Sequence, residues 1–264
     1  MEEDLHWKSA IAYARAGSIV VRGYALTDLI GRISFMEMVY LVVTGELPSK
    51  QVARVMDALL VSAAESGARA PAVLAARTVA SCGAPVTAAV AAGALTISTY
   101  HGGAVEDCML QMQSIREEVA SNGMPLAEAC RAAVRSRLDR GERLGGYGHR
   151  LHKTEDPRVQ RLFEIARAAG LKGGYLELVF AVRQALEDET GKGLPVNIDG
   201  AYAAILCEIG FPPGLANALF LLSRSVGMMA HAHEEQTRMR PRRHIHPTDW
   251  EYDGPPRREL RSRD

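Results

Sequence analysis

Hydrophobic residues recur along most of the chain at the spacing of amphipathic helices. Five apolar residues after Pro48 follow the i, i+3, i+4, i+7 pattern: Val52, Val55, Met56, Leu59 and Leu60. The pattern returns further along, where Asp156 can cap a helix and Pro157 can take its first position. We therefore predict one helix after Pro48 and another that begins at Pro157.

Other segments extend the helical pattern and leave little room for strands. Residues 213–237 form one long apolar-rich candidate, and the alanine-rich stretches 72–80 and 87–93 suit closely packed helices. Strand signals are limited to residues 18–24 and a short piece at 96–100. The pattern predicts an all-α, mainly helical fold with roughly eight to ten helices.

Composition and charge exclude several classes of protein. The 264 residues carry 31 Lys and Arg against 31 Asp and Glu, so there is no net charge to attract nucleic acid or an anionic membrane. Uninterrupted apolar runs stay below about 18 residues, which disfavours a membrane span. The four cysteines lie far apart, and the N-terminus lacks the layout of a signal peptide. We predict a cytoplasmic protein with reduced thiols and no nucleic-acid or membrane partner.

The last 26 residues, from Met239, are rich in arginine and proline and poor in aliphatic residues. This composition cannot bury a core, which leaves an extended tail, an arm on a partner subunit, or disorder. Five potential metal ligands lie in or near this region: His231, His233, Glu234, His244 and His246. On a helix, positions 231 and 233 point to different faces, so we predict no metal site.

Four short segments carry residues that a helical core does not need. The first, at 100–104, places His101 beside two glycines, and the second, at 145–150, surrounds Tyr147 and His149 with glycines. The alternatives are a histidine that caps a helix end and an ordinary glycine-rich loop.

The other two segments each carry one charged side chain. Asp199 lies between Pro195 and a helical run, where it could equally be an N-cap. Arg224 lies inside an apolar run, so it needs an anionic partner or must extend to the surface. Together, two histidines, an aspartate and arginines suit enolate chemistry on a carboxylic acid that carries several charges.

Six segments, in order, resemble motifs of the citrate synthase superfamily: VRGYALTDLIGRISFMEMVYLVVTGELPS, HGGA, GYGHRLHKTEDPR, NIDGAYAAILCEIGFP, SRSVGMMAHAHEE and RMRPRR. The short length resembles the citryl-CoA lyases and the lyase module of ATP-citrate lyase. The resemblance implies one catalytic unit over 1–264, with a large helical domain, a smaller helical lobe and a cleft between them. The large domain would comprise 1–103 and 201–238, the lobe 104–200, and the tail 239–264.

The resemblance also implies a role for each chemistry-bearing residue. Asp199 would exchange the proton at the methyl carbon of an acyl-CoA, and His101 would stabilise the resulting enolate. His149 would donate to, or take a proton from, the carbonyl or hydroxyl oxygen of a 2-oxo acid. Three arginines would bind substrate carboxylates, the last of them from the partner subunit of a homodimer: Arg158, Arg224 and Arg240. Four residues would contact CoA: Gly146, Tyr147, Gly148 and Lys153.

The implied activity is that of a citryl-CoA lyase, which cleaves citryl-CoA to acetyl-CoA and oxaloacetate without a metal or redox cofactor. A condensing enzyme of the citrate or 2-methylcitrate synthase type is one alternative, because the same residues serve both directions. A non-catalytic homologue that binds CoA or a carboxylate is another. One departure bears on the acid substrate: Glu65-Ser66 stands where the superfamily has Asp-His, with Arg69 as a substitute contact.

Overall fold

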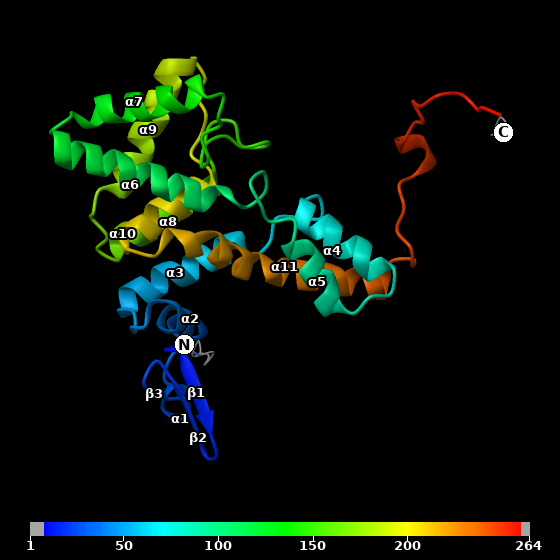
Figure 1. Cartoon of the computed structure of the whole chain (residues 1–264), viewed down its shortest axis with the longest axis horizontal. Helices are drawn as coiled ribbons and strands as arrows, with labels where there is room; N and C mark the ends of the chain where they lie inside the picture. Colours follow the sequence, from blue (N-terminus) through cyan, green and yellow to red (C-terminus); the bar gives the residue numbers. More distant parts are fainter. Residues whose placement is uncertain (1–7, 260–264) are drawn as a thin grey trace, which may run out of the picture.

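The computed structural model describes residues 8–259, and these fold mainly into helices, which confirms the predicted all-α class (Figure 1). The α-helices are α1 Leu26–Leu29, α2 Phe35–Thr44, α3 Lys50–Ala63, α4 Pro71–Ser81, α5 Val86–Ala94, α6 Ala104–Asn122, α7 Leu126–Asp139, α8 Pro157–Ala168, α9 Tyr175–Thr190, α10 Ile198–Glu208 and α11 Ala216–Arg238. Short 3-10 helices span η1 Pro213–Leu215 and η2 Pro247–Asp249. As predicted, Asp156 caps α8 and Pro157 is its first residue.

A small antiparallel sheet precedes the helices, in the order β1 Ala12–Arg15, β2 Ser18–Val21 and β3 Tyr24–Ala25. The strand signal at 18–24 is thus confirmed. A tight turn joins Val21 to its partner Tyr24, and both turn residues, Arg22 and Gly23, have positive φ angles. The strand expected at 96–100 is wrong, because that segment forms a turn with only isolated bridges from Ser98 to His101 and Gly102.

The main hydrophobic core lies between α2, α3, α6 to α10 and the first half of α11. Helix α10 lies at its centre and contacts α6, α8 and α9. Every residue of α10 from Gly200 to Cys207 is buried. This core includes residues on both sides of the predicted boundary at 104, and the division into a large domain and a lobe stays a prediction.

A second, smaller unit forms where α4, α5 and the last half of α11 pack together (Figure 1). Its core is built almost entirely from alanine side chains and Met228. A Cβ atom added to Gly93 would lie 2.7 Å from the carbonyl oxygen of Ala72, so α4 and α5 approach closely. Small residues therefore set the spacing of these helices, as the alanine-rich stretches predict.

Beyond α11, residues 239–259 extend away from the helical body and are all exposed (Figure 1). The start of this segment is anchored, because the backbone N–H of Arg242 donates to the Ser81 carbonyl at 2.7 Å. The Arg243 guanidinium also pairs with buried Glu235 at 2.6 Å. Among the helices of the described chain, none is long and apolar enough to cross a membrane.

Candidate active site

His101 lies in the turn between α5 and α6, and the two glycines that follow it are sterically required. Gly102 has a φ of +72°, and an added Cβ would approach Ile97 and Phe220 within 3.1 to 3.3 Å. A Cβ on Gly103 would lie 2.6 Å from the Ser98 carbonyl oxygen. The chain therefore doubles back tightly here, and it presents His101 half-buried beside the N-terminus of α4.

The glycine-rich loop at 145–148 is held against the segment that leads into α10. The backbone N–H of Gly148 donates to Pro195 at 2.7 Å, and that of Asn197 donates to Gly146 at 3.0 Å. A Cβ on Gly146 would lie 2.9 Å from the Cα of Gly200, so only glycine permits this approach. These contacts bring two segments about fifty residues apart in the chain to one edge of the site.

Asn197, rather than Asp199, caps α10. The Asn197 side-chain oxygen accepts from the backbone N–H groups of Asp199 at 2.9 Å and Gly200 at 3.2 Å. The Asp199 carboxylate has no hydrogen-bond partner within residues 8–259. Burial raises the pKa of Asp199 to about 6, although the charges of Arg224 and Arg158 oppose this change. Asp199 is therefore a carboxyl group poised to exchange a proton near neutral pH.

A cavity of about 1440 Å³ joins these segments. Asp199 lines it together with Tyr100 and Gly103, which flank the His101 turn, and with Gly148 and Arg150, which flank His149. The catalytic residues predicted from the sequence thus belong to segments that surround one cavity. The 145–148 loop, which includes residues predicted to contact CoA, also lines the cavity.

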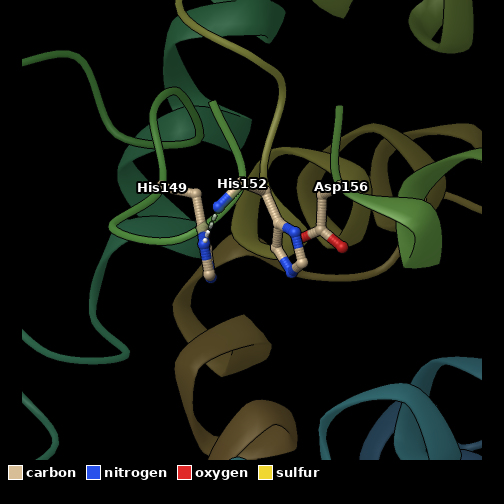
Figure 2. Close-up of side chains that lie close together, drawn as sticks. All are labelled: His149, His152 and Asp156. Carbon is tan, nitrogen blue, oxygen red and sulfur yellow. Dashed lines mark hydrogen bonds between the residues drawn. The ribbon is translucent and has the colours of Figure 1, made fainter. Parts of the chain in front are cut away.

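His149 is held in one tautomer by its own loop. Its Nδ1 accepts from the backbone N–H groups of Leu151 at 3.1 Å and His152 at 3.0 Å, so the neutral ring carries its proton on Nε2 (Figure 2). Burial, followed by the neighbouring His152, lowers the pKa of His149. His149 is therefore a neutral hydrogen-bond donor at Nε2.

The His101 ring is also held neutral. Its Nε2 accepts from the backbone N–H of Ala72 at 3.4 Å, which leaves Nδ1 as the donor. Burial lowers the pKa of His101, and the charges of Arg224 and Arg150 lower it further. Two neutral imidazoles that can each donate to an oxygen atom are the arrangement that enolate chemistry needs.

The predicted carboxylate-binding arginines differ in their environments. Arg224 is 4% exposed, and its Nε and Nη1 atoms have no hydrogen-bond partner in the described chain. Arg158, by contrast, donates from Nε and Nη2 to both oxygens of Asp156, at 2.9 and 2.6 Å. A buried guanidinium without a partner indicates a binding site for an anion, so Arg224 is the stronger candidate.

The remaining predicted contacts lie around or outside the cavity. Arg240 is exposed on the segment beyond α11, and Lys153 is exposed with its ammonium 3.4 Å from the His149 carbonyl. Neither lines the cavity. Tyr147 is buried, and its hydroxyl donates to the Val179 carbonyl in the core at 3.1 Å, so it anchors the loop. Gly146 and Gly148 both line the cavity.

Sequence reasoning missed two cations that the cavity contains. Arg143 and Arg150 line it and have no hydrogen-bonded or ionic partner among residues 8–259. Three other charged side chains of this wall pair with one another, since Arg137 lies 2.6 Å from Asp107 and 3.8 Å from Glu142. The position of Arg150 directly after His149 was the one available signal.

Glu65, which departs from the superfamily pattern, lies against α11. Its carboxylate is 3.2 Å from His231 Nε2, and a Cβ added to Gly227 would collide with it. His231 also approaches Arg77, a buried side chain of α4, at 3.4 Å. The structure therefore places His231 in a polar network with Glu65 and Arg77, and Arg69 is exposed.

The family model described as the citrate synthase C-terminal domain matches residues 48–248. The chain belongs to the citrate synthase family. The citrate synthase of Haloferax volcanii is 31% identical over 207 residues, which cover 75% of this chain and 51% of that protein. This member of the family thus spans about half the length of the curated relatives that it matches.

Two solved structures of citrate synthase-like proteins match nearly the whole chain. Citryl-CoA lyase from Hydrogenobacter thermophilus is 38% identical, with a TM-score of 0.86 over 96% of this chain and 97% of that one. A mutant ATP citrate lyase from Methanosaeta concilii, in complex with (3S)-citryl-CoA, is 19% identical. The match covers 97% of this chain and 43% of the ATP citrate lyase chain, with a TM-score of 0.83. At this identity the likeness is evidence for the fold only.

Proposed function

We propose that this citrate synthase family protein cleaves citryl-CoA to acetyl-CoA and oxaloacetate. The observation that carries the proposal is the half-buried Asp199 carboxyl, which caps no helix and lines the cavity between the His101 turn and the His149 loop. The likeness to a citryl-CoA lyase of almost equal length supports the same reaction. A thioester supplies its own carbon acidity, so the proposed chemistry proceeds without a metal or redox cofactor.

In the condensing direction, the Asp199 carboxylate takes a proton from the methyl carbon of acetyl-CoA. The enolate oxygen accepts a hydrogen bond from His101 Nδ1–H. The enolate carbon then attacks the carbonyl carbon of the oxo acid, whose oxygen accepts from His149 Nε2–H. A proton from water completes the hydroxyl group of citryl-CoA.

Cleavage is the reverse of these steps. The hydroxyl group loses its proton to water, the carbon–carbon bond breaks, and protonated Asp199 returns its proton to the enolate carbon. The tautomer of His149 favours a donor over an acceptor, so His149 stabilises the oxyanion and leaves the proton to water. This narrows the two roles that the sequence left open for His149.

The cations on the cavity wall and in the nearby core suit a thioester that carries both phosphate and carboxylate groups. Arg143 and Arg150 offer unpaired guanidinium groups on the wall for phosphates. Buried Arg224 offers a second anionic subsite, for a carboxylate of the acid. The four cysteines are free thiols, which supports a reducing, cytoplasmic location.

We further propose that the protein is a homodimer with Arg240 of each chain completing the partner's site. The α4–α5–α11 unit has a small alanine core and exposes Leu74, Val226 and Met229, each about half accessible. Apolar side chains exposed on one helical unit are typical of a subunit interface. The exposed segment from residue 239 is suited to reach a partner.

Two assays with purified protein test the reaction. Citryl-CoA should yield acetyl-CoA and oxaloacetate, and acetyl-CoA with oxaloacetate should yield little free CoA. Release of free CoA from the condensation, without cleavage of citryl-CoA, would establish the alternative, a synthase of the citrate or 2-methylcitrate type.

The non-catalytic alternative rests on Glu65-Ser66 in place of the superfamily Asp-His. It predicts that CoA thioesters bind without turnover of any 2-oxo acid. Calorimetric titration with acetyl-CoA beside turnover assays over a panel of 2-oxo acids separates the two, since turnover of any acid in the panel removes this alternative.

A further inference from the structure

His152 has no part in the reaction steps above, yet its ring lies directly on the ring of His149. The two ring centroids are 4.5 Å apart and the ring planes are 30° from parallel, so the imidazoles are stacked. The His152 ring is half-buried, and its backbone N–H is one of the two donors to His149 Nδ1 (Figure 2). His152 thus contacts His149 through both its side chain and its main chain.

The other neighbour of His152 is Asp156. Figure 2 shows His152 between His149 and Asp156, and one polar atom from each of the three side chains lies within 4.8 Å of the other two. Both oxygens of Asp156 already accept from Arg158, and His149 Nδ1 already accepts from two backbone groups. Because these hydrogen bonds already occupy the ligand atoms, the three side chains are poorly arranged to share a metal ion. They interact with one another through charge and packing instead.

We propose that His152 is a positioning residue that fixes the plane of the His149 imidazole and keeps that ring uncharged, so that Nε2–H remains a donor to the substrate oxygen. A stacked neighbour restricts rotation about the side-chain bonds of His149. The adjacent His152 also opposes a positive charge on the His149 ring, in the same direction as burial. The role in catalysis rests on the proposed function.

The groups that face His149 act in both directions. His152, Arg158 and Lys153 oppose a positive charge on the ring, whereas Asp156 favours one. Asp156 is itself paired with Arg158 at 2.6 Å, which weakens its effect on His149. Burial acts together with the three basic groups, and His152 is the strongest of them.

Two substitutions separate the steric effect from the charge effect. His152→Phe keeps a flat ring in the stack but carries no charge, whereas His152→Ala removes both. His233→Phe, which replaces an exposed histidine of α11, is the matched control. The measurements are kcat and KM for citryl-CoA cleavage as a function of pH, and an NMR titration of the His149 ring assigned with His149→Gln.

We expect His152→Ala to lower kcat by about 10- to 100-fold with KM nearly unchanged, the effect of a misplaced catalytic group. His152→Phe should restore most of kcat at neutral pH, while the NMR titration of His149 moves to higher pH. A wild-type kcat in His152→Ala, or an unmoved His149 titration in His152→Phe, would overturn the proposal. The NMR titration requires no turnover. If the His149 titration moves in a protein that has no lyase activity, the charge effect of His152 is supported and the proposed reaction is rejected.

Discussion

The side-chain oxygen of Asn197 caps α10 by accepting a hydrogen bond from the backbone N–H of Asp199 at 2.9 Å, so the Asp199 carboxylate is not needed to cap the helix. The carboxylate instead lines the cavity, where burial raises its pKa to about 6. The sequence left Asp199 itself as a candidate cap of this helix, and the structure gives that role to Asn197.

The raised pKa of Asp199 makes a prediction about stability. A carboxyl group with a higher pKa in the folded state supports folding at low pH, and this contribution is lost as pH rises through about 6. Asp199→Asn should therefore raise the free energy of unfolding by about 1–3 kcal/mol at pH 7, but by little at pH 4. Urea denaturation at the two pH values measures this, and Asn197→Ala, which removes the cap, should lower stability at both by about 1 kcal/mol. Equal stability of wild type and Asp199→Asn at pH 7 would mean that the carboxylate is not desolvated.

Arg224 makes a prediction in which stability and binding move in opposite directions. Because its guanidinium is buried without partners for Nε and Nη1 in the described chain, Arg224→Met should raise the free energy of unfolding by about 1 kcal/mol. The same variant should weaken binding of the acid substrate about 100-fold, since a charge-assisted contact is lost. Thermal melting and calorimetry with oxaloacetate measure the two effects. Unchanged affinity for the acid would show that Arg224 binds no substrate carboxylate.

The unpaired cations of the cavity wall predict which residues hold the phosphates of CoA. Arg143→Gln and Arg150→Gln should each weaken acetyl-CoA binding by about 10-fold, the value of one charge-assisted hydrogen bond. Lys153→Gln should have a smaller effect, because Lys153 does not line the cavity. Fluorescence titration with acetyl-CoA and with acetyl-pantetheine, which lacks the phosphates, tests this. The arginine variants should lose their disadvantage with acetyl-pantetheine, and an equal loss with both ligands would contradict the phosphate assignment.

Arg240 predicts complementation between inactive subunits. If each Arg240 acts in the partner's site, then Asp199→Asn and Arg240→Gln should each be inactive alone, and mixed dimers should contain one native site. Equal mixing after reversible dissociation should restore about a quarter of the wild-type activity. Sedimentation equilibrium verifies the dimer. A dimer that gains no activity on mixing would place Arg240 outside the partner's site.

Most helices were predictable from the sequence because each buries one face, and burial imposes the 3.6-residue period on its apolar positions. Strand β1 was missed because all four of its residues are exposed, so it carries no alternation to detect. The strand expected at 96–100 failed because the close packing around Gly102 and Gly103 folds that segment into a turn.

The site was predictable only in part, because a motif names residue types without fixing their partners. The pairing of Arg158 with Asp156 depends on how α8 begins, and the stacking of His152 on His149 depends on the loop conformation. Arg143 and Arg150 can be recognised as candidate phosphate ligands only once the fold shows that the neighbouring Arg137 is paired with Asp107. Such relationships require coordinates.

We propose that Asp199 is the base that exchanges the proton of the acyl-CoA methyl group. The most direct measurement is deuterium exchange from solvent into the methyl group of acetyl-CoA, with an oxo-acid analogue bound, in wild type and in Asp199→Asn. We expect exchange in wild type to rise with pH through about 6, the pKa of the Asp199 carboxyl. We expect exchange in the folded variant to be slower by about two to four orders of magnitude, the range for loss of general acid–base assistance. Exchange at the wild-type rate in Asp199→Asn would contradict the account.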